Sequence, residues 1–118
     1  MRVIIAGSRD IDDYDVLLQA IKLSKFDITS IISGHALGVD TLGEIYAKNN
    51  DIPLSIFKAD WNTYGKKAGY LRNVEMAENA DALLAIHNGK SRGTQHMIQI
   101  AHNKELISYV HLDKISSE

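Results

Sequence analysis

The sequence predicts a single α/β domain in three layers, with a mostly parallel five-stranded sheet and helices on both faces. Five short apolar runs alternate with amphipathic helical patterns along the 118 residues. The apolar runs hardly alternate with polar residues, which is typical of strands buried on both faces of a parallel sheet. The length fits one domain, and 45% hydrophobic residues suffice for one core. We expect the domain to span residues 1–112, followed by a frayed tail at 113–118.

The strands are predicted where an apolar run stops at a turn residue. Gly7 ends the first run, and Ser33-Gly34 ends the second. The predicted strands lie at residues 3–6, 28–32, 53–57, 82–86 and 106–110.

The helices are predicted from apolar residues that recur at helical spacing. In the first helix Val16, Leu17, Ala20 and Ile21 share one face, and acidic residues stand at its start. The segment 61–70 has no such pattern and is expected to be irregular. The predicted helices lie at residues 13–23, 39–49, 71–79 and 94–103.

Composition excludes several classes of protein. A net charge of −2 argues against generic coating of DNA, which needs a basic field. The absence of cysteine excludes disulfides and thiol chemistry and fits a reducing compartment. The apolar run at residues 3–6 is too short for a signal peptide, and no stretch approaches the roughly 20 apolar residues of a membrane span. We therefore expect a soluble cytoplasmic protein.

Three loops that contain glycine follow predicted strands, at residues 7–10, 33–40 and 88–94. In parallel sheets ligands bind beyond the carboxyl ends of the strands, so we expect the three loops to meet at one edge. The loop at 88–94 runs from a strand into a helix, and a helix N-terminus favours anions.

In the first loop we expect Gly7, Ser8 and Arg9 to contact a ligand, because a guanidinium matches phosphate geometry. The alternative is a strand-to-helix turn with a surface pair between Arg9 and Asp10.

The second loop offers Gly34 and Asp40, and Asp40 either contacts a ligand or caps the following helix. His35 is a candidate proton donor. The spacing between His35 and the other histidines is not that of metal ligands. We expect neither a metal nor a cofactor.

The segment 59–73 gathers aromatic and cationic side chains outside the strands. Aromatic rings offer a stacking face for a base, and cations offer phosphate contacts. Trp61 is alternatively a cover over the core. Arg72 is predicted at a helix start, where a cation opposes the helix dipole unless an anion is near. The candidate binding residues here are Trp61, Tyr64, Lys66, Arg72 and Asn73.

The third loop carries the strongest signal for an anion site. It is not a Walker A loop, because Gly89-Lys90-Ser91 lacks the earlier glycine of that motif. The alternative is a flexible surface turn with a helix N-cap at Ser91 or Thr94. The candidate phosphate-binding residues are Gly89, Ser91, Arg92, Gly93 and Thr94.

Motifs along nearly the whole chain carry a family resemblance. They are Gly-Ser-Arg at 7–9, Ser-Gly-His-Ala-Leu-Gly-Val-Asp at 33–40, Ala-Asp-Trp at 59–61, Tyr-Gly-Lys at 64–66, Ala-Gly at 68–69, Arg-Asn at 72–73, Ala-Asp-Ala at 80–82 and Ser-Arg-Gly-Thr at 91–94. This pattern resembles the SLOG superfamily of Rossmann-like domains, and within it a small YspA-like branch. That superfamily includes the Lonely Guy phosphoribohydrolases and DNA-processing protein A. The resemblance implies a nucleotide or nucleotide-derived ligand and a homo-oligomer, such as a homodimer.

One departure from the resemblance bears on catalysis. In the hydrolases an arginine and a glutamate form the catalytic pair. Arg72 matches the arginine, but Met97 stands at the glutamate position, and Asn73 replaces a lysine. A positioned acid or base contributes about 10²–10⁴ in rate, and methionine cannot supply it.

These observations favour a binding module or sensor over an enzyme. The first alternative is a hydrolase that cleaves the N-glycosidic bond of a nucleoside 5′-monophosphate, with Arg72 as a catalytic residue. The second is an accessory protein that binds single-stranded DNA, which the net charge of −2 disfavours.

Overall fold

A five-stranded parallel sheet organises the chain, as the sequence predicts. The computed structural model describes residues 1–113. The strand order is β3-β2-β1-β4-β5, and every neighbouring pair is parallel. The predicted fold class is thus confirmed. The strands are β1 Arg2–Gly7, β2 Ser30–Ser33, β3 Leu54–Ile56, β4 Ala82–His87 and β5 Ile107–Leu112.

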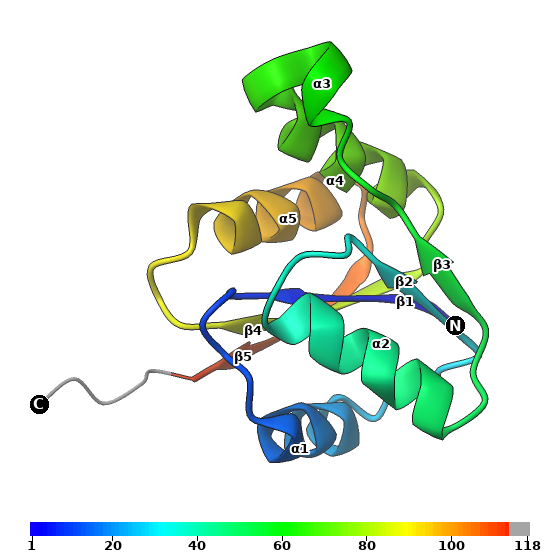
Figure 1. Cartoon of the computed structure of the whole chain (residues 1–118). Coiled ribbons are helices and arrows are strands. Elements are labelled where there is room, and N and C mark those ends of the chain that lie inside the picture. Colours follow the sequence, from blue (N-terminus) through cyan, green and yellow to red (C-terminus); the bar gives the residue numbers. More distant parts are fainter. Residues whose placement is uncertain (114–118) are drawn as a thin grey trace, which may run out of the picture.

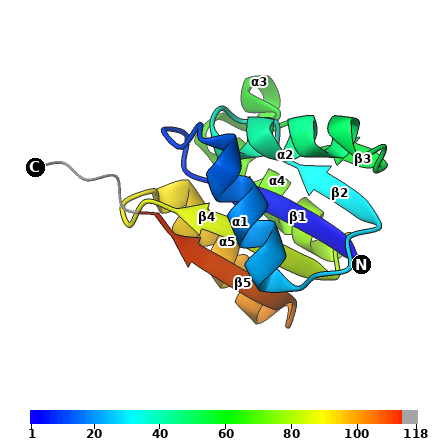
Figure 2. The ribbon, with the colours of Figure 1, turned by 90° about the horizontal axis from the view of Figure 1, so that it is seen from below.

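Helices cover both faces of the sheet. Helices α1 and α2 lie on one face, α4 and α5 lie on the other, and α3 projects beyond the sheet (Figure 1). The view turned by 90° shows α1 crossing the strands (Figure 2). The helices are α1 Tyr14–Ser24, α2 Val39–Asn49, α3 Trp61–Tyr64, α4 Ala68–Glu78 and α5 Arg92–Asn103, with the 3₁₀ turn η1 at Gly65–Lys67.

Side chains of the central strands pack into two separate cores, one on each face of the sheet. In β1, Val3 and Ile5 pack under α1 and α2, whereas Ile4 and Ala6 face α4 and α5. All six residues of β4 are buried. Burial on both faces explains why these strands read as continuous apolar runs.

The structure corrects the prediction for residues 61–70. This segment is not irregular, because it forms α3, η1 and the first turn of α4. The side chain of Asp60 caps α3 by accepting a hydrogen bond from the backbone N–H of Thr63, at 3.1 Å. Arg72 consequently lies in the second turn of α4 and not at a helix start, so the predicted conflict with the helix dipole is absent.

At the carboxyl end the prediction of a frayed tail falls mostly on residues 114–118, outside the described residues. Asp113 itself is ordered by the sheet, since its N–H donates to the carbonyl of His87 at 2.8 Å.

Two glycines allow the first loop to pack against α2. A Cβ on Gly7 would lie 2.2 Å from the carbonyl oxygen of Ile86 and 2.7 Å from Val39 Cγ2. Gly38 has φ +77°, and a Cβ there would lie 2.3 Å from the carbonyl oxygen of Ser8. That carbonyl also accepts the N–H of Val39 at 3.3 Å, so the loop itself closes the N-terminus of α2.

Gly38→Ala should destabilise the protein more than Gly65→Ala does. Both glycines adopt similar backbone angles, 77°/−126° and 57°/−132°, that disfavour a Cβ by about 1–3 kcal/mol. Only at Gly38 does the Cβ also meet backbone atoms, whereas nothing lies within 4 Å at Gly65. Overpacking at Gly38 adds about 1–3 kcal/mol to this loss. Urea unfolding would measure the free energy of unfolding of each variant, with the slope against urea concentration unchanged. Equal losses in the two variants would contradict the close packing of loop and helix.

Candidate functional site

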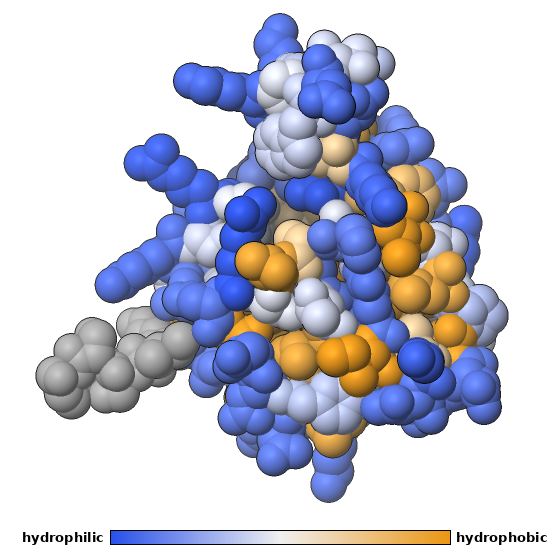
Figure 3. All heavy atoms as spheres, viewed as in Figure 1, coloured by the Kyte–Doolittle hydropathy of each residue, from blue (hydrophilic) through white to orange (hydrophobic). Residues whose placement is uncertain are grey.

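A cavity of about 500 Å³ opens at the carboxyl edge of the sheet. Its wall comes from all three predicted loops and from α4 and α5, although these segments lie far apart in the sequence. In the space-filling view a recess lies below the projecting α3, and hydrophilic residues form much of its rim (Figure 3). A smaller cavity of about 210 Å³ adjoins it, and the two share Arg9, Ala36 and Arg72.

Most of the candidate residues line one cavity or both. The larger cavity is lined by Gly7, Arg9, Asp40, Arg72, Asn73, Ser91, Gly93 and Thr94. The smaller one adds Gly34 and Trp61. The candidates that line neither cavity are Ser8, Tyr64, Lys66, Gly89 and Arg92.

The first and third loops are tied together by hydrogen bonds. Ser8 is fully buried, and its hydroxyl oxygen accepts the N–H of Asn88 at 3.0 Å. The amide of Asn88 donates to both carboxylate oxygens of Asp10, at 3.0 and 3.2 Å. Asp10 therefore pairs with Asn88 and not with Arg9, which leaves the Arg9 guanidinium at the cavity wall.

The third loop is shaped by its own side chains. Asn88 Oδ1 accepts the N–H groups of Lys90 and Ser91, at 2.7 and 3.0 Å, and Gly89 has φ +92°. Ser91 is the N-cap of α5, as one alternative predicted, and its Oγ accepts the N–H of Thr94 at 3.2 Å. The loop is thus a fixed turn that aims the N-terminus of α5 at the cavity.

The start of α5 presents open backbone donors. Within residues 1–113 the N–H groups of Arg92 and Gly93 have no acceptor, as expected in a first helical turn. Gly93 lines the cavity, and a Cβ added there would meet nothing within 4 Å. These N–H groups and the helix dipole favour an anion at this wall.

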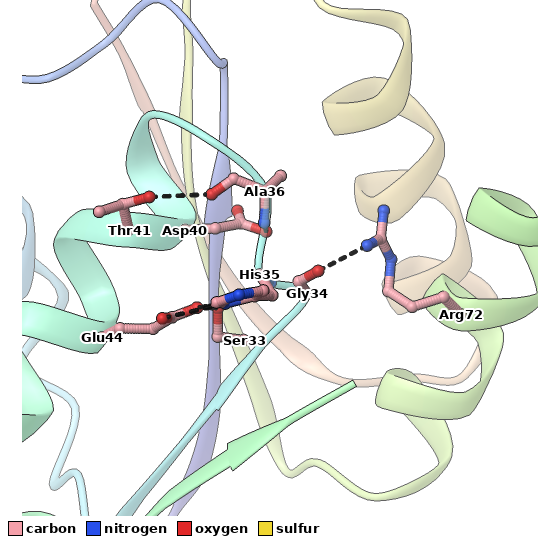
Figure 4. A network of polar contacts seen from close by, with 8 residues as sticks. All are labelled: Ser33, Gly34, His35, Ala36, Asp40, Thr41, Glu44 and Arg72. Atoms are coloured by element: carbon pink, nitrogen blue, oxygen red, sulfur yellow. Dashed lines mark hydrogen bonds and ion pairs between the residues drawn. The ribbon is translucent and has the colours of Figure 1, made fainter. Parts of the chain in front are cut away.

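Arg72 reaches from α4 to the second loop (Figure 4). Its Nη1 donates to the carbonyl of Gly34 at 2.7 Å, and its Nε donates to Asn73 Oδ1 at 3.1 Å. Burial lowers the pKa of Arg72; Asp40 partly offsets this, and the positive charge of Arg9 adds to the lowering. Arg72 is therefore a half-buried cation at the wall between the two cavities, beside a second cation.

Asp40 is the buried carboxyl of the site, with 5% of its surface exposed. It does not cap α2, whose N-cap is Gly38; instead its Oδ2 accepts the N–H of Ala36 at 3.2 Å. Burial raises the pKa of Asp40, although the Ala36 N–H and the charge of Arg72 oppose the shift. Among residues 1–113 no salt bridge joins Asp40 to Arg72.

His35 is held in an unusual backbone conformation at the smaller cavity. Its φ is +62°, a left-handed value that costs a residue with a Cβ about 1 kcal/mol or more. Glu44 fixes the ring through Nδ1 at 3.0 Å and accepts the hydroxyl of Ser33 at 2.7 Å (Figure 4). Glu44 is thus committed to these partners and does not line either cavity.

His96 supports the site from outside the cavity. Since Asn73 Oδ1 accepts from Arg72, its Nδ2 donates to His96 Nδ1, at 2.9 Å. Burial lowers the pKa of His96, which favours the neutral ring whose Nδ1 accepts this hydrogen bond. Tyr70 stacks on this ring with centroids 4.4 Å apart. His96 therefore fixes the orientation of Asn73, a contact between two helices that the sequence pattern does not reveal.

Several lining residues were missed by the sequence reasoning. The apolar wall at Met76 and Met97 carries no polar signal, and both are buried in the core under α4 and α5. Asn88 had a readable signal, because Asn-Gly is a turn dipeptide whose side chain bonds its own backbone. The other polar or charged lining residues outside the candidate list are Asp10, His35, Lys58 and Lys90.

Among residues 1–113 no group of three or more potential metal ligands lies close enough to hold an ion. None of the helices in this part of the chain is long and apolar enough to cross a bilayer.

The comparisons with known proteins agree with the resemblance found in the motifs. Residues 1–64 match the YspA, cpYpsA-related SLOG family. The gene 61 protein of Mycobacterium phage D29 is 34% identical over 110 residues, which cover 85% of this chain and 87% of the phage protein.

Asp40→Asn should change how stability depends on pH. Since burial raises the pKa of Asp40 above 3.8, the folded state binds its proton more tightly than the unfolded state. This contribution to stability is present below pH 3.8 and is lost as pH rises through the raised pKa. The free energy of unfolding, measured with urea from pH 4 to 7, should therefore rise progressively for the variant relative to the wild type. The opposite slope would show that attraction to Arg72 outweighs burial.

Proposed function

Because this chain belongs to the YspA, cpYpsA-related SLOG family, we propose that it binds a nucleotide or nucleotide-derived molecule in the cavity at the carboxyl edge of its sheet. The phosphate lies between the N-terminus of α5 and the side chains of Arg9 and Arg72. The base or sugar fills the rest of the larger cavity. In this role the protein is a sensor or binding module and carries out no catalytic step.

The charge of the cavity wall carries this proposal. Three cations line the larger cavity, Arg9, Arg72 and Lys90, against two carboxyls, Asp10 and Asp40. Asp10 already accepts two hydrogen bonds from Asn88, and Asp40 accepts the N–H of Ala36, so among the described residues neither carboxyl forms a salt bridge with these cations. The remaining positive charge, together with the open N–H groups of α5, complements a phosphate.

Arg9→Gln and Arg72→Gln should each weaken nucleotide binding. Removing one charge-assisted contact to a phosphate costs about 1.5–3 kcal/mol, which is roughly ten- to a hundredfold in affinity. Isothermal titration of AMP, ADP and cyclic AMP would measure the loss. Lys22→Gln is the matched control, because it removes one positive charge from the exposed surface of α1. If folded wild-type protein binds none of these nucleotides, the proposed function is wrong.

Gly93→Ala should separate binding from stability. The added methyl meets no protein atom within 4 Å, and alanine favours a helix over glycine by up to about 1 kcal/mol. The variant should therefore melt at the same temperature or slightly higher. The methyl nevertheless occupies space beside the open N–H groups, so nucleotide affinity should fall about tenfold or more. Unchanged affinity in this variant would place the phosphate elsewhere.

One observation favours a second candidate, the phosphoribohydrolase. Asp40 is a carboxyl with a raised pKa that shares the larger cavity with Arg72, and such a pair is typical of acid–base sites. Met97 also lines this cavity, which leaves the wall at that position without a proton-transferring group. In such a hydrolase the proton-transferring carboxyl would be Asp40 on α2 and not a residue of α5.

The binding proposal predicts that the protein leaves AMP intact. Hydrolysis would add water across the N-glycosidic bond and release adenine and ribose 5-phosphate. Chromatography of AMP after overnight incubation with the protein should show no adenine above a protein-free control. Adenine that disappears with both Arg72→Ala and Asp40→Asn would establish the hydrolase instead.

A further inference from the structure

The smaller cavity has the character of a ligand subsite. It continues the larger cavity on the other side of Arg9 and Arg72 and is lined in addition by Lys58, His35 and Trp61. Among its lining residues no Asp or Glu is present, so its charge is positive. A terminal phosphate in the larger cavity would leave this second space unfilled.

Trp61 lines the smaller cavity and packs against α4. Its ring packs on α4, where a Cβ added to Gly69 would lie 3.3 Å from Trp61 Cη2. Trp61 is nevertheless 53% exposed and belongs to neither buried core cluster. Covering the core, the other explanation for this residue, is therefore excluded. An exposed indole beside cations is a stacking surface for a base.

The wall that the two cavities share, at Arg9 and Arg72, favours an anion. Arg9 and Arg72 carry like charges, and their mutual proximity disfavours the charged form of Arg72 beyond the effect of burial. Arg72 already donates to Gly34 and Asn73, and Asp40 forms no salt bridge with it within the described residues. A phosphate at this wall would relieve the repulsion.

We propose that the ligand belongs to the dinucleotide class, with a phosphate or diphosphate linkage over Arg9 and Arg72. One arm fills the larger cavity and a second, aromatic arm stacks on Trp61 in the smaller cavity. This inference rests on the proposed function and adds the second arm to it. Two cavities with a cationic wall between them match a central anion with a group on each side.

Trp61 also provides the readout, because it is the single tryptophan of the chain. AMP, ADP and diadenosine 5′,5′-diphosphate are titrated by calorimetry and by tryptophan emission. The diadenosine compound should bind about five- to a hundredfold more tightly than ADP, because stacking of one base on an aromatic side chain strengthens binding by roughly that factor. It should also change the emission of Trp61 far more than AMP does.

Variants separate this inference from the function on which it rests. Trp61→Ala and Lys58→Gln should remove the advantage of the diadenosine compound over ADP, whereas Lys22→Gln should retain it. If ADP and the diadenosine compound bind equally and Trp61→Ala changes neither affinity, the second arm is refuted, and binding of the mononucleotides still supports the proposed function. If none of the three compounds binds the folded protein, both proposals fail.

Discussion

The parallel pairing of β1 with both β2 and β4 is the constraint on which the site depends. It directs the carboxyl ends of three strands to one edge, so loops about 80 residues apart in the sequence share one cavity wall. The hydrogen bond from Asn88 to Ser8 then joins the first and third loops. Without the glycines at 7 and 38, the first loop would lie too far from β4 and α2 to form this wall.

Among the described residues, the cations of the site form no salt bridge with its carboxyls, which have other polar partners. Asp10 accepts hydrogen bonds from Asn88, and Asp40 accepts the N–H of Ala36. Glu44 is hydrogen-bonded to Ser33 and His35. Arg72 is bonded to a carbonyl and an amide, neither of which carries a negative charge. Positive charge that the protein leaves unneutralised at a cavity wall is what a phosphate ligand requires.

The sequence predicted what depends on local pattern. The apolar runs predicted every strand of the sheet to within a few residues. Burial on both faces explains this signal for β1 and β4, whereas the edge strands β3 and β5 are largely exposed. The rule that parallel strands bind ligands at their carboxyl ends placed most candidate residues on one cavity. The segment 61–70 was mispredicted because its helix is short and its signal is the single cap at Asp60.

Side-chain partners across elements could not be read from the sequence. Ser8 looked like a ligand contact and instead is buried between loops, while Arg92 precedes Gly93 in the same motif but lies outside the cavity lining. The contact between Asn73 and His96 joins two helices whose relative rotation only packing fixes. Such contacts decide which cation faces the cavity, and no periodicity encodes them.

The position of the phosphate is the central claim, and amide chemical shifts in a nucleotide titration would test it most directly. On addition of AMP to ¹⁵N-labelled protein, the largest shifts should come from the amides of residues 88–94, above all Gly93, and from Gly7 to Asp10. The amides at the opposite edge of the sheet, near Asp81, should hardly move. Shifts that are largest at the opposite edge, or that avoid the start of α5, would contradict the account.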